Sequence, residues 1–301
     1  MHFADRLAVA VKKRQTSVLV GLDPRPRQLP AKLTPAGTGP EEIAIAYRQF
    51  CHGIIDTVAD LVPAVKPQAA FFEQLGPSGM QALADVVKYA RERGLLVVMD
   101  AKRGDIGSTA EAYALAYLGD DSAWGGDALT VNPYLGDDSL TPFVERCQQT
   151  SSGIFILVKT SNPGGTLFQD LETGEQKVYE HVADHVESLA AATSGACGYG
   201  CVGAVVGATY PEELAALRQR MPHAWLLIPG FGSQGGTAKD VAVGFDEQGM
   251  GALINSSRAI IFAYDRPEYE SIGRADWQRA VEQATKDMIL QLHAAMNQDA
   301  S

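Results

Sequence analysis

Four charged residues are crowded into the end of one apolar run of the sequence. The stretch "VVMDAKRGDIGST" covers residues 97–109 and contains Asp100, Lys102, Arg103 and Asp105. Burying a charge is costly unless the charge is paired. The cluster is therefore either a solvated turn that follows a strand or a set of mutually paired groups that does acid–base chemistry.

Alternation along a strand indicates where these side chains point. Asp100 and Lys102 are two residues apart, so on a strand they share one face. Arg103 falls on the opposite face, where we expect it to pair outside the site. Lys66 lies in another apolar run. A row of Lys66, Asp100 and Lys102, with Asp105 arching over it, would alternate in sign, and such neighbours keep each group charged.

The elements that position this row are short apolar runs that alternate along the chain with helical stretches. Near-continuous apolar runs suit strands that are covered on both faces. Eight such strands alternating with helices predict an α/β fold, a single (β/α)8 TIM barrel. A doubly wound sheet would usually carry GxGxxG after its first strand, where this chain reads "GLDPRP". The runs cover residues 17–23, 64–71, 95–102, 128–134, 153–161, 202–209, 224–231 and 251–258.

The remaining segments complete the predicted organisation. We expect one domain over residues 1–301, with a barrel core at about 17–262, an N-terminal helix and a C-terminal helix at about 275–297. Residues 164–182 form an insertion after strand five. Its "DLETGEQKVY" segment is typical of a small hairpin with a Thr-Gly turn.

Composition limits the partners and the compartment. The 301 residues carry a formal net charge of −11, which argues against a broad nucleic-acid or anionic-membrane surface. The apolar runs are too short for a membrane span. The four cysteines contain no CxxC pair, so we expect free thiols and a cytoplasmic protein. His181 and His185 lack an evident third ligand, so we expect a solvated helix face rather than a metal site.

Polar residues collect at the expected carboxyl ends of the strands, where TIM barrels place their chemistry. Asp23 ends the first strand and "KTSN" follows the fifth. The glycine-rich "PGFGSQGG" follows the seventh, and the eighth ends in "SSR" at Arg258. Glycine-rich backbone and an arginine can bind phosphate oxygens, and this is the common phosphate position of the fold.

These residues carry a resemblance to a known family. Asp100-x-Lys102-x-x-Asp105-Ile106-x-x-Thr109 resembles the D-x-K-x-x-D-I-x-x-T signature of the orotidine 5′-monophosphate decarboxylases. "DAKRGDIGST" together with "KTSNPG" resembles the longer bacterial subfamily, and the similarity runs from about residue 17 to 262. It implies cofactor-free decarboxylation of orotidine 5′-monophosphate to uridine 5′-monophosphate, the last step of UMP biosynthesis.

The resemblance implies a role for each catalytic residue. Lys102 would donate a proton to C6 of the pyrimidine after carbon dioxide leaves. Asp100 would lie beside the scissile carboxylate, and Lys66 would hold the array and the ribose. Asp105 and Thr109 would reach into the site of the other subunit of a homodimer.

The resemblance also implies how the substrate is bound. Asp23 would bind ribose hydroxyls and Ser161 would read the pyrimidine edge. Gln234, nearby glycine backbone and the Arg258 guanidinium would hold the phosphate. The remaining expected substrate contacts are Ile106, Thr109, Pro229 and Gly235.

The sequence departs from the family pattern at one position, and two alternative functions remain. The chain reads "INSSR" where many members of the family have V-G-R, so Ser257 replaces a glycine beside the phosphate-binding arginine. A related barrel could act as a sugar-phosphate aldolase or a keto-acid phosphate decarboxylase. These relatives are often metal-dependent, and Lys66 argues against such a metal site. A catalytically silent nucleotide-binding barrel is the other alternative.

Overall fold

The computed structural model describes residues 1–35, 37–232 and 236–298. Within these residues, eight parallel strands close into a barrel in the order β1-β10-β9-β8-β5-β4-β3-β2. The predicted TIM barrel is therefore confirmed. The strands are β1 Val18–Leu22, β2 Ala64–Pro67, β3 Leu96–Arg103, β4 Ala128–Val131, β5 Gly153–Lys159, β8 Val202–Val206, β9 Leu226–Pro229 and β10 Ala252–Ser256.

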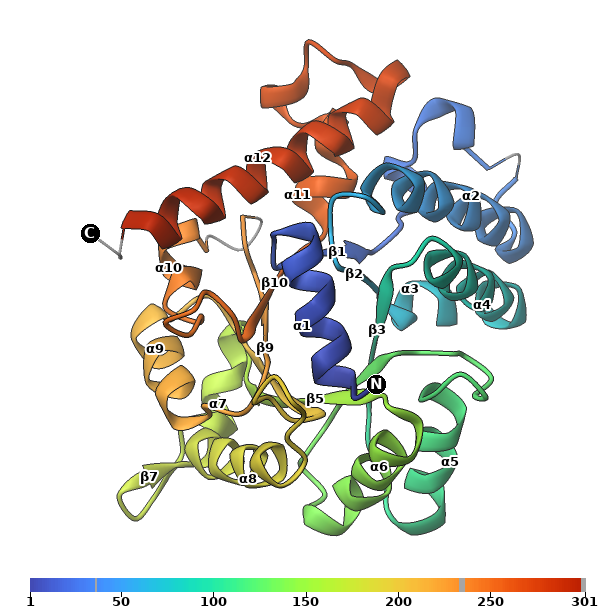
Figure 1. Ribbon diagram of the computed structural model, residues 1–301. Helices are drawn as coiled ribbons and strands as arrows, with labels where there is room; N and C mark the ends of the chain where they lie inside the picture. Colours follow the sequence, from blue (N-terminus) through green and yellow to red (C-terminus); the bar gives the residue numbers. More distant parts are fainter. Residues whose placement is uncertain (36, 233–235, 299–301) are drawn as a thin grey trace.

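Helices surround the barrel, as Figure 1 shows. Their sequences explain several of their ends. Pro40 and Pro211 each take the first helical position, where a missing N–H costs nothing, and acidic residues follow both prolines. The helices are α1 Phe3–Arg14, α2 Pro40–Val58, α3 Ala69–Glu73, α4 Gly76–Glu92, α5 Gly107–Tyr117, α6 Asp137–Thr150, α7 Thr166–Gln169, α8 Val178–Ala192, α9 Pro211–Arg220, α10 Ala238–Ala242, α11 Arg258–Ile261 and α12 Trp277–Gln298.

The second predicted strand is too long. Residues 64–71 were expected to be extended, but β2 ends at Pro67 and α3 begins at Ala69. Phe72 of α3 is fully buried and packs edge-on against Tyr47 of α2, with 6.0 Å between the ring centroids. The end of the apolar run therefore folds into a short helix, because Phe72, the residue just after the run, is buried against α2 rather than between strands.

The amino-terminal end of the barrel is closed by α1. Phe3 packs onto Gly153 at the start of β5, where a Cβ atom would lie 2.2 Å from the Phe3 ring. Arg6 forms an ion pair with buried Asp127, and Asp127 also accepts a hydrogen bond from the Val97 N–H at 2.9 Å. These contacts fill the end of the barrel that lies opposite the carboxyl ends of the strands.

The insertion after β5 contains more structure than the predicted hairpin. It opens with α7 and continues into a two-stranded sheet, β6 Glu172–Thr173 and β7 Gln176–Lys177. The hairpin is confirmed, but its turn is formed by Gly174 and Glu175 rather than by Thr173 and Gly174, since Thr173 pairs with Gln176. Its expected last residue, Tyr179, belongs to α8. The Lys177 N–H donates to Glu180 Oε2 at 2.7 Å, and this capping interaction ends the hairpin two residues early.

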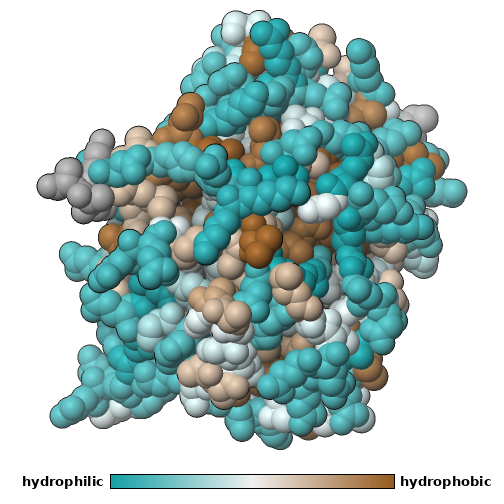
Figure 2. Space-filling view, in the orientation of Figure 1, coloured by the Kyte–Doolittle hydropathy of each residue, from teal (hydrophilic) through white to brown (hydrophobic). Residues whose placement is uncertain are grey.

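The last helix covers one flank of the barrel. Trp277 at the start of α12 packs on Phe50 of α2, with 5.3 Å between the ring centroids. Figure 2 shows a mostly hydrophilic face on which apolar groups form small, separate patches. Among the described residues, no helix is both long and apolar enough to cross a bilayer.

Candidate active site

The charged row predicted from the sequence is present at the carboxyl ends of β2 and β3. Lys66 Nζ lies 2.6 Å from Asp100 Oδ2, and Lys102 Nζ lies 2.5 Å from Asp100 Oδ1. Lys66 and Asp100 are buried, whereas the Lys102 side chain is 46% exposed. The aspartate therefore bridges two ammonium groups, one below it in the barrel and one at the mouth of the site.

Two neutral residues complete the surroundings of Asp100. Gln68 Nε2 donates to Asp100 Oδ2 at 3.0 Å, and the Thr130 hydroxyl donates to Asp100 Oδ1 at 3.1 Å. Neither residue was predicted from the sequence. A signal for Thr130 exists, since it is the one polar residue in the buried strand β4. Gln68 had no such signal, because it was expected inside the second strand. In the structure this strand ends one residue earlier, at Pro67.

The backbone of β3 is bent where it presents Lys102. The pairing of β3 with β4 shifts register between Met99 and Arg103, and Lys102 has a φ of +49°. A residue other than glycine in this left-handed region is uncommon, and such conformations cluster at functional sites. Thr130 Oγ1 accepts hydrogen bonds from the N–H groups of Ala101 (3.1 Å) and Lys102 (2.9 Å). One hydroxyl thus fixes both the bent backbone and the carboxylate.

Electrostatics keep the buried pair ionised. Burial alone would lower the pKa of Lys66, but the charges of Asp100 and Asp23 outweigh it and raise that pKa. Burial alone would raise the pKa of Asp100, but Lys66 and Lys102 hold it well below its ordinary value. The pair therefore carries full charges over the neutral pH range.

The array opens into a cavity of about 230 Å³. Ser161 and Pro229, both predicted to contact substrate, line this cavity, and so does Asn162, which was not in the predicted set. Asp23 lies close enough for its charge to act on Lys66, and its buried Oδ1 accepts no hydrogen bond from any described residue. The other lining residues are Lys66, Asp100, Lys102, Thr130, Leu157, Thr160, Val205 and Leu227.

The Asp105 carboxylate makes a local hydrogen bond. Its Oδ1 accepts a hydrogen bond from the next N–H, that of Ile106, at 2.8 Å. Ile106 and Thr109 are exposed at the start of α5. The ion pairs of the row join Lys66, Asp100 and Lys102, and the place of Asp105 beside them stays a prediction.

Arg103 points away from the array, as its position on the strand predicted. Its guanidinium pairs with Glu73 of α3 and donates to the Tyr117 hydroxyl at 2.9 Å. It also lies over the rings of Tyr113 and Tyr117. These contacts link β3 to α3 and α5 and leave Arg103 outside the substrate cavity.

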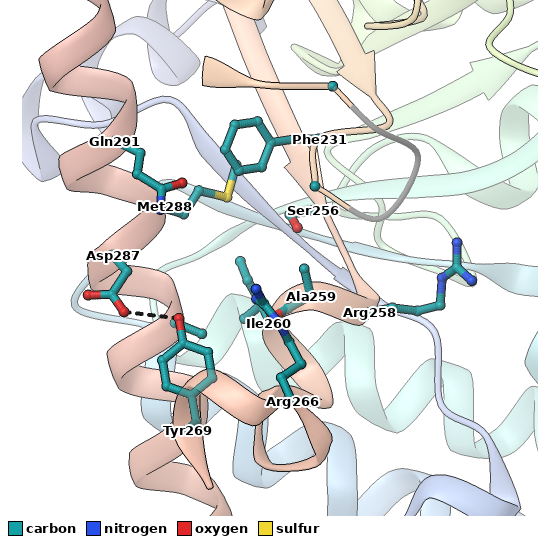
Figure 3. Close-up of a pocket in the computed structure, with 13 residues that line it drawn as sticks. Phe231, Ser256, Arg258, Ala259, Ile260, Arg266, Tyr269, Asp287, Met288 and Gln291 are labelled. Atoms are coloured by element: carbon teal, nitrogen blue, oxygen red, sulfur yellow. Dashed lines mark hydrogen bonds between the residues drawn. The ribbon is translucent and has the colours of Figure 1, made fainter. Parts of the chain in front are cut away.

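A second cavity, of about 380 Å³, lies beside Arg258. Figure 3 shows the Arg258 guanidinium directed away from the hydrogen-bonded pair Tyr269 and Asp287, whose oxygens are 2.9 Å apart. Gly232, Gly236 and Ser256 also line this cavity, between the loop after β9 and α12. Gln234 and Gly235, predicted to contact phosphate, lie outside the described residues.

The serine that replaces a glycine before Arg258 has a specific neighbour. A Cβ atom placed on Gly21 of β1 would lie 1.8 Å from Ser257 Oγ. Gly21 therefore makes the space that the Ser257 side chain occupies. The substitution is accommodated on the adjacent strand, so Arg258 keeps its place at the start of α11.

Together, these features define the class of protein: a TIM-barrel enzyme with a charged Lys–Asp–Lys array facing its cavity and an arginine after the last strand. The model of the "Orotidine 5′-phosphate decarboxylase / HUMPS family" matches residues 16–272. The chain belongs to this family, as the sequence motifs predicted.

Individual relatives agree with this assignment. An orotidine 5′-phosphate decarboxylase of Rhodopirellula baltica is 54% identical over 97% of this chain and 99% of its own length. The corresponding protein of Deinococcus radiodurans is 44% identical over 87% and 89%. The solved OMP decarboxylase of Leishmania donovani superposes with a TM-score of 0.76 at 33% identity, covering 99% of both chains.

The shifted pKa values predict how the array contributes to stability at different pH. The pKa of Asp100 is lowered from its ordinary value of 3.8, so its contribution is present above that value and is lost as the pH falls through the lowered one. The pKa of Lys66 is raised, so its contribution is lost only above 10.5. We expect Asp100→Asn to reduce the free energy of unfolding by about 3 kcal/mol between pH 6 and 9.

This difference from the wild type should shrink below about pH 4, because the Asp100 carboxyl of the unfolded chain then takes up a proton while the native carboxylate stays ionised. Denaturant unfolding at a series of pH values measures it. Asp60→Asn is the matched control, because the Asp60 side chain is 96% exposed. A difference for Asp100→Asn that stays constant down to the lowest pH would contradict the lowered pKa.

Proposed function

We propose that the Lys66–Asp100–Lys102 array performs the family's decarboxylation, with Lys102 as the proton donor. The chain catalyses the conversion of orotidine 5′-monophosphate to uridine 5′-monophosphate, the last step of UMP biosynthesis, and is a carboxy-lyase. The observation that supports the roles is the placement of a buried carboxylate between two ammonium groups, with the outer one at the cavity.

The proposed chemistry follows from the charges. The bond between C6 and the substrate carboxylate breaks, and its electron pair stays on C6. Asp100 lies beside the scissile carboxylate, whose negative charge is relieved when carbon dioxide leaves. The Lys102 ammonium stabilises the developing carbanion and then transfers its proton to C6. Solvent returns a proton to the partly exposed Lys102.

The remaining residues are proposed to bind the nucleotide. The buried Asp23 Oδ1 has an acceptor position available for a ribose hydroxyl, and Lys66 is its charged neighbour. Ser161 would contact the pyrimidine edge. The phosphate would lie near Arg258, with contributions from Gln234 and Gly235, and Pro229 would contact the nucleotide in the array cavity. Phosphate binding far from C6 can supply energy for ordering the reacting centre.

We also propose a homodimer with shared active sites. Asp105, Ile106 and Thr109 make no part of the cavity lining of their own chain, which supports a place in the neighbour's site. Large apolar side chains in the segments that follow β3 and β4 are exposed and would be covered by such an interface. They are Ile106 (57%), Leu115 (56%), Tyr134 (83%) and Leu135 (49%).

The alternatives are separated by one assay. The proposal requires no coenzyme or metal, whereas related aldolases are often metal-dependent. Loss of orotidylate absorbance in the ultraviolet, with purified protein and excess chelator, supports the cofactor-free decarboxylase. Activity abolished by chelator and restored by a divalent cation would favour a metal-dependent barrel. A constant absorbance would favour the silent nucleotide-binding barrel. The cytoplasmic location and the single-domain organisation stay predictions.

Replacing the proton donor should abolish turnover. We expect Lys102→Ala to lower kcat at least about 1,000-fold, because it removes both the stabilising charge and the proton. Lys88→Ala is the matched control, since the Lys88 side chain is 78% exposed on α4. The ultraviolet assay measures both variants. A Lys102→Ala enzyme within tenfold of the wild type would overturn the assignment.

Replacing the arginine after β10 should weaken nucleotide binding. We expect Arg258→Ala to raise KM about 10- to 100-fold, the range for hydrogen bonds to a charged group. Arg279→Ala, at an exposed position of α12, is the control. Isothermal titration with uridine 5′-monophosphate gives the affinity directly. An unchanged affinity would argue against phosphate binding by Arg258.

Mixing two inactive variants tests the shared site. In a hybrid dimer of Lys102→Ala and Asp105→Ala chains, one site keeps both native residues. We expect the mixture to regain about a quarter of wild-type activity after subunit exchange, because half of the dimers are then hybrids. Each variant mixed with itself is the control. No recovery, with exchange verified by differently tagged chains, would place Asp105 outside the neighbour's site.

A further inference from the structure

Lys159 is a buried charge that the proposed chemistry does not use. Its side chain is only 3% exposed, at the end of β5. Leu157, two residues earlier, lines the cavity, but Lys159 lies over the rings of Tyr179 and Tyr210, at 4.7 and 5.6 Å from their centroids. The pairing of β5 with β8 shifts register between Leu157 and Lys159. This irregularity turns Lys159 away from the cavity and towards α8 and α9.

The charge of Lys159 is balanced by the insertion. Its ammonium pairs with Asp170, directly after α7, and lies 3.6 Å from Glu213 Oε2 of α9. A buried lysine needs such partners, because an unpaired buried charge is costly. The insertion therefore supplies a carboxylate that holds the end of β5.

The next residue of the strand end is bound by the same insertion. The Thr160 N–H donates to Gln169 Oε1 at 3.0 Å, and Gln169 Nε2 donates to Thr160 Oγ1 at 2.8 Å. Gly165 allows this approach, since a Cβ atom there would lie 2.9 Å from Thr160 Oγ1. Gln169 thus satisfies the backbone and the side chain of Thr160 with one amide.

The residue that follows Thr160 is Ser161, the proposed contact to the pyrimidine edge. Its backbone is confined on the other side by Gly207, where a Cβ atom would lie 2.9 Å from Ser161 N. Ser161 is therefore held between β8 and a strand end that α7 and Asp170 fix. Gln169 can therefore affect the site through Thr160, and it needs no direct contact with the cavity to do so.

We propose that Gln169 is a positioning residue for substrate recognition: through Thr160, it sets the place of Ser161 at the pyrimidine. The role of the insertion is then to hold the end of β5 in the geometry that binds the base. This inference rests on the proposed function of Ser161 and adds to it the residue that orients it.

Steady-state kinetics of Gln169→Ala with orotidine 5′-monophosphate test the inference. We expect kcat/KM to fall about five- to tenfold, chiefly through KM, the effect of losing about one positioned hydrogen bond. Gln176→Ala is the matched control: it removes the same side chain from the same insertion, but Gln176 bonds to Asp184 of α8 at 3.3 Å. Gln169→Glu should restore wild-type kinetics, because its carboxylate can accept from both Thr160 groups.

A double variant distinguishes positioning from a general loss of stability. If Gln169 acts through Ser161, then Ser161→Ala with Gln169→Ala has the same kcat/KM as Ser161→Ala alone. Multiplied losses in the double variant, or kinetics of Gln169→Ala equal to those of Gln176→Ala, would overturn the inference. Wild-type protein that is inactive on the substrate would instead overturn the proposed function, so the two failures are separable.

Discussion

The buried carboxylate of Asp100 constrains the rest of the site. An aspartate inside a barrel is tolerated only if donors surround it, and four side chains provide them: Lys66, Gln68, Lys102 and Thr130. Removing one donor would leave a buried charge less well compensated. The surroundings of Asp100 therefore fix the ends of three neighbouring strands relative to one another, and the outer ammonium takes its position from the same carboxylate.

Irregular strand ends decide which groups face the substrate. The register shift in β3 leaves Lys102 at a positive φ, held by Thr130, with its ammonium on Asp100. The shift in β5 has the opposite result, because it turns Lys159 outward to the insertion. Strand ends in a parallel barrel are free to depart from the ladder. In this protein one departure places Lys102 at the cavity, and the other places Lys159 in a buried pair with the insertion.

The two ends of the barrel have separate tasks. The amino-terminal end is closed by α1, where Phe3 packs on Gly153 and Arg6 pairs with Asp127. The carboxyl ends carry the array, the cavity and Arg258. The insertion belongs to the carboxyl end, since α7 binds the end of β5. A fold organised in this way can change its recognition loops without disturbing the packing that closes the opposite end.

The sequence by itself determined the barrel and the array, because both follow from local patterns. Eight apolar runs predict strands, and the spacing of two between Asp100 and Lys102 directs both side chains to one face. Only the tertiary structure decided the partners Gln68 and Thr130, the space that Gly21 leaves for Ser257, and the direction of Lys159. These depend on contacts between segments far apart in the chain and on register shifts, and residue spacing along one strand carries no information about either.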